Sequence, residues 1–562
     1  MTPNRNAMRR NALAAAAALA CTFTAHAIEL DGPDADTKIR LDFTPKYSVA
    51  YRLKNPSSGL TSPLANGDPG VVNENDGDLN FRKGVVSNRM DLLTEFDVAG
   101  KQWGLRVSHA AWYDTQYLRH NDNDGSLVVN NQPGQAADEF IPFTRTQHGR
   151  GDQLLDAFVY AKGSLGDMPG SLRIGKHALQ YGESLFFGQN GIAAAQGPVD
   201  VAKILSVPNW QFKEVLLPVE QVSGNLQIAD GVSVGGYYQF KWRPSKIPGV
   251  GSYFSNQDYI GGGRVYFGPP LPPLLVTDPS KNQTPPNHGQ FGGQIRWSPK
   301  GSDYEFGLYA ARYHEKTPSS LDFDLINGNA HTTYAQGVKT VGASVTSSVG
   351  QLNWALEGSL RWDAPLAGDP AVLGGAPFMP PANCDGTAAN PCYAIGRTAH
   401  LNLSGIYVLQ KGPLWDGGVL LGELAWNRTL SVTKNPSAVG FGGLDPNTTR
   451  DAAALRMIFE PQYFQVAPGL DLSVPLGLGY NFGGRSSAIF NFAGGTSQSG
   501  DFTVGIKGKY QTVWNVGLTY TGFFGKEATF TVTDPRTPTR MLSFGQSLKD
   551  RDYLAFTVSR TF

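Results

Sequence analysis

The chain has 562 residues, with 47 basic and 47 acidic side chains, 41% hydrophobic residues and only 17% charged ones. Outside the N-terminal region no run of about eighteen apolar residues occurs, which argues against membrane-spanning helices. The balanced charge argues against nucleic acid as a partner. The length allows several soluble domains or one large closed sheet.

Residues 1–27 have the three parts of a secretory signal peptide. Arg5, Arg9 and Arg10 form a basic start, residues 12–20 an apolar core, and Ala25-His26-Ala27 a small-residue cleavage site. We therefore expect export, and a mature protein that consists of one domain covering residues 28–562.

The first long strand is predicted at residues 39–53. Its odd positions are apolar or aromatic and its even positions are polar or small, with Pro45 the one exception. Side chains alternate faces along a strand, so one face is apolar and the other polar. A soluble sandwich could use such a strand, but about fifteen residues is long for one. Aromatic residues near both ends of the apolar face are typical of a strand that crosses lipid.

The same alternation recurs along the chain as hairpins. Paired runs joined by short turns occur at 87–98 and 103–113, 154–161 and 172–176, 222–228 and 232–242, 291–297 and 304–310, 341–345 and 352–362, 401–409 and 420–426, 455–463 and 470–480, and 502–510 and 514–524. Much longer polar segments separate the hairpins. Short periplasmic turns alternating with long extracellular loops are typical of bacterial outer-membrane barrels. We predict an all-β fold, a transmembrane antiparallel barrel of about 18 strands (16–20), with residues 263–267 in a folded outer loop.

The segment 179–220 is too long and too apolar for an ordinary loop. We expect it to fold into the lumen as a constriction, with candidate residues Glu183, Asp200, Lys203, Lys213 and Glu214 near the narrowest point. The alternative is an outer cap packed on neighbouring loops.

Strand alternation also predicts a charged inner wall of both signs. Its constriction candidates are Arg40, Arg106, Arg296, Arg361 and Arg456, within a larger set of Lys46, Arg52, Lys241, Arg243, Lys507, Lys509, Asp42, Asp91, Glu95, Asp97, Glu305, Glu357, Glu423 and Glu460. These side chains would either filter solutes or form cross-strand ion pairs that hold the wall.

Two cysteines of the predicted mature chain, Cys384 and Cys392, lie close together in a Pro/Gly/Asn-rich segment. In an oxidising compartment we expect a disulfide between them.

Acidic runs at 73–78 and 121–125 contain the oxygen-rich residues that calcium loops use, but neither has EF-hand spacing. Turn chemistry is the favoured interpretation, and we predict no metal or cofactor.

His400, Asn402 and Ser404 share one face of a predicted strand, as barrel lipases arrange such groups. A polar face with period two produces such trios by chance, so we predict no enzymatic activity.

The chain ends in an alternating strand that finishes at Phe562. A terminal aromatic residue resembles the signal that the barrel-assembly machinery recognises. Pairing this strand with residues 38–53 would close the sheet and leave no edge in lipid.

Several motifs resemble the Gram-negative "domain of unknown function 1302" family. They are Asp76-Gly77-Asp78-Leu79-Asn80-Phe81, residues 87–95, Ala111-Trp112-Tyr113-Asp114, Tyr181-Gly182-Glu183-Ser184, Pro198-Val199-Asp200-Val201, residues 213–219 and residues 251–255. The resemblance implies an outer-membrane protein linked to periplasmic lipid-carrier-like proteins, RND-type permeases and hydrophobic compounds. It offers no catalytic or ligand residues to carry over.

These observations together predict a passive outer-membrane channel for small hydrophobic or aromatic compounds, with outer-membrane lipids as surroundings. A general porin for hydrophilic solutes and a structural or adhesin-like barrel are the alternatives.

Overall fold

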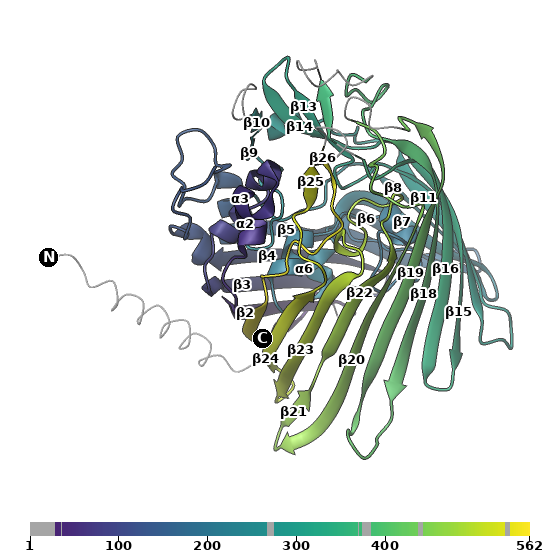
Figure 1. Ribbon diagram of the computed structural model, residues 1–562. Helices are drawn as coiled ribbons and strands as arrows, with labels where there is room; N and C mark the ends of the chain where they lie inside the picture. The colour runs from purple at the N-terminus through teal and green to yellow at the C-terminus, as the bar shows by residue number, and fades with distance from the viewer. Residues whose placement is uncertain are drawn as a thin grey trace.

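The computed structural model describes residues 28–34, 36–266, 275–368, 370–373, 384–436, 442–533 and 540–562. The predicted signal peptide lies outside these residues. The main element is a closed antiparallel barrel (Figure 1). Its strands are β1 (Ile28–Asp31), β2 (Lys38–Arg52), β3 (Gly84–Ala99), β4 (Trp103–Asp114), β5 (Arg150–Leu165), β6 (Met168–His177), β7 (Val219–Ala229), β8 (Val232–Gln239), β11 (Gln290–Trp297), β12 (Glu305–Tyr313), β15 (Val338–Val349), β16 (Leu352–Pro365), β18 (Ile395–Leu409), β19 (Gly417–Lys434), β20 (Asp451–Ala467), β21 (Leu470–Ser473), β22 (Leu476–Gly484), β23 (Ser499–Tyr510), β24 (Trp514–Phe524) and β27 (Tyr553–Arg560).

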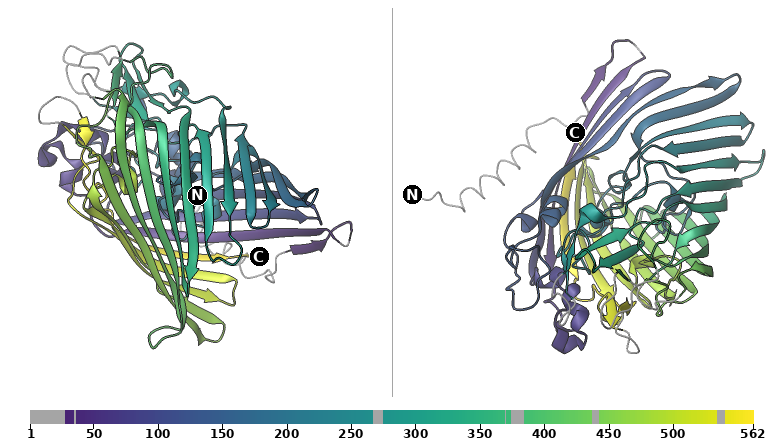
Figure 2. Two further views of the ribbon diagram at one scale, coloured as in Figure 1. Left: turned by 90° about the vertical axis from the view of Figure 1, so that its right-hand side faces the viewer. Right: turned by 90° about the horizontal axis from the view of Figure 1, so that it is seen from above.

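These twenty strands occupy eighteen positions around the barrel. β21 and β22 share one position because both pair with β20 on one side and β23 on the other. β1 pairs with the first residues of β2 and so continues the row of β27. The predicted number of about eighteen strands is therefore confirmed, and neighbouring strands run side by side along the wall (Figure 2).

The barrel closes between its first and last long strands. β2 and β27 pair in antiparallel register from Lys46 with Ser559 to Arg52 with Tyr553. Beyond β27, the amide of Phe562 donates to the carbonyl of Phe43 at 2.9 Å, and the amide of Phe43 donates to the carbonyl of Phe562 at 3.2 Å. The predicted closure is confirmed, and the closed ring satisfies backbone groups that lipid could not.

Burial along the wall is inverted relative to a soluble sheet. On β18, Leu401 and Leu403 are 42% and 44% exposed, whereas His400, Asn402 and Ser404 are buried. On β2 the polar residues 42, 44, 46 and 48 are likewise the buried ones. Apolar side chains therefore face outward to lipid and polar side chains face the lumen, as in a transmembrane barrel.

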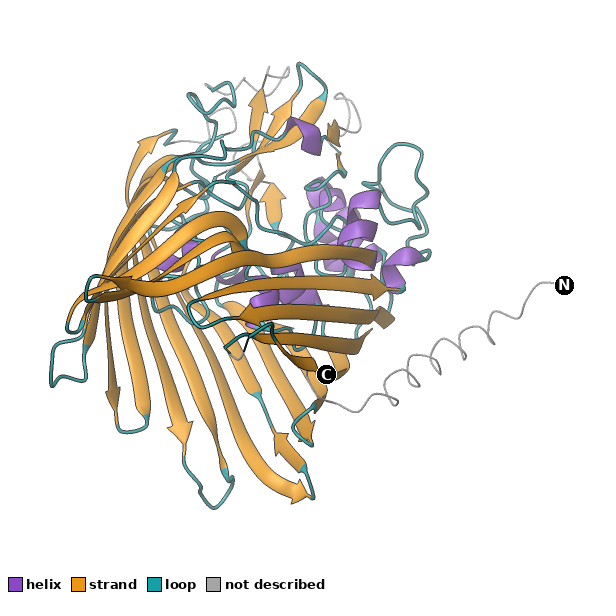
Figure 3. Ribbon diagram, turned by 180° about the vertical axis from the view of Figure 1, so that it is seen from behind, coloured by secondary structure: helices purple, strands orange, loops and turns teal. Residues whose placement is uncertain are grey.

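The long connections gather at one end of the barrel, the upper end in Figure 1, which we call the outer end. They contain α2 (Ser58–Thr61), α3 (Pro63–Asn66), η1 (Pro69–Asn73), α4 (Asp76–Leu79), η2 (Gln116–Leu118), α5 (Pro142–Thr144), η3 (Arg145–Gly149), η4 (Ile192–Ala195), α6 (Val201–Ser206), α7 (Phe212–Val215), η5 (Pro279–Lys281) and η6 (Phe492–Gly494). These short helices lie within the barrel opening and at its outer end (Figure 3). Among the described residues, no helix has the length and hydropathy needed to cross a membrane.

Two small sheets complete the outer end. One has the strand order β17 (Ala371–Leu373), β13 (Ser320–Asp324), β14 (Asn329–Thr333), β10 (Leu275–Thr277) and β9 (Arg264–Val265), and the other pairs β25 (Thr531–Thr533) with β26 (Arg540–Leu542). β9 lies within the stretch 263–267 that was predicted to belong to a folded outer loop, and its place in this separate sheet agrees with that prediction. Residues 267–274 lie outside the described part of the chain.

The predicted turn at 162–170 is too long. β5 and β6 pair as far as Leu165 with Met168, and Gly163 and Gly170 form one of the pairs. Glycine has no side chain and so adds nothing to an alternating pattern. The alternation therefore gave strands that are too short in this glycine-rich stretch.

Candidate functional site

Residues 178–218, which connect β6 to β7, form what we call the lumenal segment. It contains η4, α6 and α7 and hydrogen-bonds to inward-facing side chains of the wall. An outer cap would make no such bonds. The contacts therefore agree with the infolded arrangement predicted from its length and apolar content.

Glu423 on β19 is the first anchor of this segment. One carboxylate oxygen, Oε2, accepts three successive backbone amides, those of Leu185, Phe186 and Phe187, at 3.1 Å and 2.9 Å for the first and last. The other oxygen accepts the side-chain amide of Asn402 at 2.7 Å. The carboxylate is 1% exposed. Hydrogen bonds to a charged acceptor are the stronger kind, so this carboxylate fixes the turn at 185–187.

Glu357 on β16 is the second anchor. Its two oxygens accept the backbone amides of Glu183 and Ile192, which lie on either side of the first anchored turn. Gly182 has φ +88°, and a Cβ there would lie 2.2 Å from Glu357 Oε2. Gly182 thus permits both the left-handed backbone and the close approach of the carboxylate.

Polar groups around Asn190 extend this attachment. The Asn190 side chain donates to the side chain of Asn402 at 2.6 Å and to the carbonyl of Trp426 at 3.0 Å. Arg361 on β16 donates to the carbonyls of Gln189 and Gly191 at 2.9 and 2.8 Å. The first half of the lumenal segment is therefore attached to β16, β18 and β19.

The second half of the segment reaches the opposite wall. Lys213 pairs with Glu95 on β3, and Asn209 donates to Thr557 on β27 at 2.7 Å. In the eighteen-position ring, β3 lies halfway around from β16. The lumenal segment therefore crosses the barrel along a diameter, from the Glu357 anchor to the Glu95 contact.

Local interactions order the helices of this crossing. The Asp200 side chain caps α6 by accepting the amide of Lys203 at 2.8 Å and pairs with Lys246 at 3.6 Å. α7 begins with a capping box between Gln211 and Glu214. Lys203 and Glu214 are 3.3 Å apart, so the two helices are joined by a buried ion pair.

The predicted wall arginines divide into two groups. Arg296 pairs with Glu183 at 2.9 Å, Arg361 holds the 189–191 backbone, and Arg106 pairs with Glu95, the partner of Lys213. Arg40 pairs instead with Asp42, and Arg456 with Asp501. Arg296, Arg361 and Arg106 therefore support the lumenal segment, and the role of all these residues at a constriction stays a prediction.

The strongest anchors were not among the predicted constriction candidates. Glu357 and Glu423 were placed on the inner wall by strand parity, and their partners are backbone amides. Every residue except proline has a backbone amide, so the residue types in a sequence do not indicate which amide a carboxylate will bind. The signal available was that each carboxylate faces inward on its strand.

His400, Asn402 and Ser404 also serve this attachment. Ser404 Oγ donates to the carbonyl of Glu183 at 3.1 Å, and His400 Nδ1 lies 3.1 Å from Asn190 Oδ1. The serine hydroxyl is thus bonded to the lumenal segment and not to the histidine, which is not the arrangement of a catalytic pair.

Two adjoining cavities lie beside α6, between the lumenal segment and the β2–β4 wall. The first holds about 10 Å³, roughly the room that one water molecule needs, and is lined mainly by apolar and aromatic side chains, including those of Val86, Tyr117, Tyr253, Phe254 and Tyr553. The second, also of about 10 Å³, is lined by charged groups and by Trp112, its charged residues being Arg89, Asp200, Lys203 and Lys246. Both share Arg89, His148 and Ser206, so an aromatic space opens beside a charged one.

His148, in the outer connection before β5, is uncharged at this boundary. Burial, together with the charges of Arg89 and Lys246, lowers the pKa of His148 to about 3. Its Nε2 accepts the amide of Gly249 at 3.1 Å, and its ring stacks on Tyr117 with centroids 5.0 Å apart. The neutral ring therefore belongs to the apolar side of the cavity.

The predicted disulfide is present at the outer end. Cys384 and Cys392 form a disulfide. Within the described ranges, no group of three His, Cys, Asp or Glu side chains gathers in a way that could hold a metal.

Comparisons with known proteins give one family and distant structural likenesses. The sequence profile described as "Protein of unknown function (DUF1302)" matches residues 8–562. No curated protein matches. Similar solved structures include OpdK of Pseudomonas aeruginosa with vanillate (12% identity, 93% of this chain and 98% of that chain, TM-score 0.38). Others are a BenF-like porin of Pseudomonas fluorescens (9%, 94% and 99%, 0.39) and the channel DcaP of Acinetobacter baumannii (9%, 95% and 99%, 0.33).

Proposed function

The chain belongs to the DUF1302 family of proteins of unknown function, and we propose that it is an outer-membrane channel through which small hydrophobic or aromatic compounds diffuse passively. The outward apolar face of its closed barrel suits a bilayer, and a closed barrel of this size can enclose a passage. The outer membrane of a Gram-negative bacterium is the compartment in which such barrels are found. Assembly through the strand ending at Phe562 is part of this proposal.

The observation that carries the proposal is the diameter-spanning lumenal segment. An open general porin leaves a wide aqueous lumen, whereas here residues 178–218 cross the interior and are held at both walls. Solutes must therefore pass beside the segment. The segment constricts the passage, and the contacts of Glu357, Glu423 and Glu95 hold it in place.

The aromatic cavity beside α6 supports the class of solute. Ligand sites for small apolar molecules are lined by aromatic groups with a few polar ones, and the lining of this water-sized space has the same character. The adjoining space is lined by charged groups, so an apolar surface lies next to a polar one beside α6. Partnership with periplasmic lipid-carrier-like proteins or RND-type permeases would remove such compounds on the periplasmic side.

A general porin for hydrophilic solutes is the second candidate, because the inner wall carries ion pairs of both signs such as Arg456 with Asp501 and Lys507 with Glu460. The two functions differ in which solutes cross and in whether the aromatic cavity matters.

Uptake by proteoliposomes tests the proposal. The variant Ser206→Phe places a bulky ring on α6 where both cavities meet, and Ser126→Phe, at an exposed outer position, is the matched control. We expect an uncharged benzene derivative to enter at least about tenfold faster than a sugar of similar size, and Ser206→Phe alone to slow it. Equal entry of both solutes, unaffected by Ser206→Phe, would favour the general porin and overturn the proposal.

A further inference from the structure

The outer end holds two buried acidic residues that a backbone hydrogen bond joins. Asp76, at the start of α4, and Asp258, in the connection between β8 and β11, are 1% and 0% exposed. The backbone amide of Asp76 donates to Asp258 Oδ2 at 2.8 Å, and the two carboxyl groups are close enough for the charge of Asp76 to act on Asp258. The connection between β2 and β3 is thereby joined to a second connection far away in sequence.

One oxygen of each carboxyl group lacks a protein partner. Asp76 Oδ2 accepts the backbone amide of Asn130 at 3.1 Å, but Asp76 Oδ1 and Asp258 Oδ1 are buried and accept no hydrogen bond within the described residues. A buried, unsatisfied carboxylate oxygen is costly. A bound proton or a bound cation would remove this cost at the two oxygens.

Asn130 adds a third oxygen of the same kind. Its side-chain nitrogen donates to Asn73 Oδ1 at 3.1 Å and to the carbonyl of Arg264, which fixes the orientation of the amide. Its Oδ1 is buried and accepts no hydrogen bond from the described residues. Asn130 belongs to the connection between β4 and β5, so three outer connections meet here.

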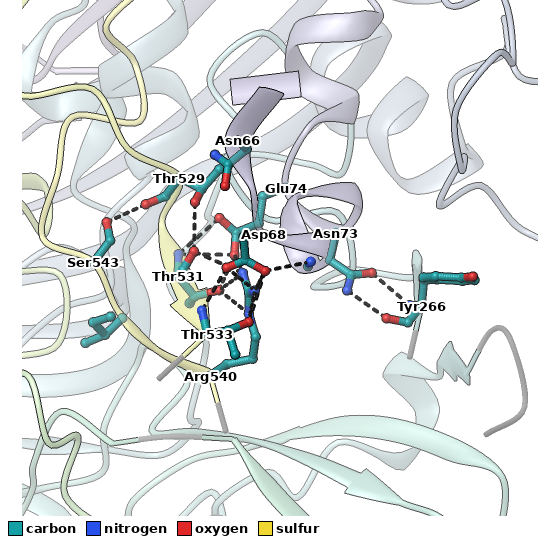
Figure 4. A network of polar contacts seen from close by, with 12 residues as sticks. Asn66, Asp68, Asn73, Glu74, Tyr266, Thr529, Thr531, Thr533, Arg540 and Ser543 are labelled. Atoms are coloured by element: carbon teal, nitrogen blue, oxygen red, sulfur yellow. Dashed lines mark hydrogen bonds and ion pairs between the residues drawn. The ribbon is translucent and has the colours of Figure 1, made fainter. Parts of the chain in front are cut away.

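The acidic residues near Asp76 in sequence differ from it because each of them is paired with an arginine. Glu74 and Asp68 both bind Arg540, at 3.1 and 2.7 Å (Figure 4). Asp78 pairs with Arg52 and Arg551 at 2.7 and 2.9 Å. At Asp76 the nearby cation is Arg264, which donates instead to the carbonyl of Val129 at 3.2 Å. The protein thus supplies a bonded arginine to each of these three neighbours but not to the Asp76–Asp258 pair.

The electrostatics agree with an unneutralised pair. Burial raises the pKa of Asp76 to about 7, and burial together with the charge of Asp76 raises the pKa of Asp258 well above its ordinary value. The carboxyl groups would be ionised at neutral pH if a positive charge lay between them.

We propose that Asp76, Asp258 and the amide oxygen of Asn130 form a binding site for a calcium ion. Calcium prefers carboxylate and amide oxygens and tolerates irregular coordination completed by water, whereas zinc favours the histidine and cysteine ligands that this cluster lacks. The bound ion joins the connections 53–83, 115–149 and 240–289 and holds the outer end closed over the barrel. This site is independent of the proposed transport function.

Equilibrium dialysis of the purified full-length mature protein with radioactive calcium, after removal of metals by a chelator, tests the proposal. We expect one ion per chain, little competition from equimolar magnesium, and at least about tenfold weaker binding by Asp76→Asn and by Asp258→Asn. Asp124→Asn, which changes an exposed acid in the other acidic run, should bind like the wild type.

Limited proteolysis provides a second measurement that does not need the variants to fold equally well. Calcium should slow cleavage of the wild-type outer connections several-fold and leave Asp258→Asn unchanged. No calcium bound at millimolar concentration by the wild type, or unchanged binding by Asp258→Asn, would overturn the site and show that the pair holds protons.

Discussion

At the scale of single residues, the lumen is organised by carboxylates that accept backbone amides. Parity along β16 and β19 predicts that Glu357 and Glu423 face inward, and they do. Their partners could not be predicted, because the amides of residues 183–192 reach them only after the chain has folded back into the barrel. The pairing of Asp76 with Asp258 was unpredictable for the same reason, since it joins separate connections.

Gly182 gives a residue-scale prediction. The change Gly182→Ala forces a Cβ onto Glu357 Oε2 at a φ of +88°, so it should loosen the 182–192 turn by about 1–3 kcal/mol. Trypsin cleavage after Lys203 and Lys213 should then accelerate. Gly188→Ala is the control, because the nearest atom to a Cβ there is Ala193 Cβ at 3.7 Å. Equal cleavage of the two variants would contradict the anchoring role of Glu357.

His148 gives a prediction about pH. Its pKa is about 3 in the folded protein and near 6.5 in the unfolded chain, so only the unfolded chain takes up the proton between these values. Stability from the neutral ring is therefore complete above about pH 6.5 and is lost as the pH falls toward 3.

Urea unfolding measures this effect. Lowering the pH from 7 to 4.5 should destabilise the wild type by about 2 kcal/mol more than the variant His148→Gln. The same pH dependence in both proteins would show that the ring is not held neutral.

At the scale of elements, alternation predicts which segments are strands but not where they end. β5 and β6 extend into a glycine-rich stretch, and β8 ends at Gln239, before the predicted Trp242. Glycine has no side chain to show alternation, and strand ends depend on the neighbouring strand. The small sheet β17-β13-β14-β10-β9 was not predicted, because strands of two to five residues carry too little pattern.

The closing strand pair gives a prediction at this scale. Removing Phe562 leaves the amide and carbonyl of Phe43 without their partners at the barrel seam. We expect insertion into lipid vesicles to slow several-fold. The rate of insertion is measured by the heat-dependent mobility shift of the folded barrel on gels. Phe562→Leu keeps the backbone bonds and serves as the control. If both variants insert equally slowly, the aromatic ring and not the seam is what matters.

At the scale of the whole molecule, the closed barrel, its strand number and its inward-folded segment follow from alternation, connection lengths and the apolar content of residues 179–220. The sequence could not supply the direction of the crossing. The segment runs from β16 and β19 to β3 and β27. Carboxylates on β16 and β19 accept its backbone amides, and Glu95 on β3 and Thr557 on β27 bind its side chains on the other side of the ring. The central claim is that this crossing constricts the channel.

Single-channel conductance in planar bilayers tests that claim most directly. The mature protein is compared with the double variant Glu357→Gln/Glu423→Gln, with a variant lacking residues 189–212, and with Glu460→Gln as control. Glu460 also faces inward, but it bonds to Ser473 and Lys507 on the wall. We predict a small conductance for the mature protein and the control, and a several-fold larger one for the double variant and the deletion. Equal conductance in all four proteins would contradict a constricting role for the lumenal segment.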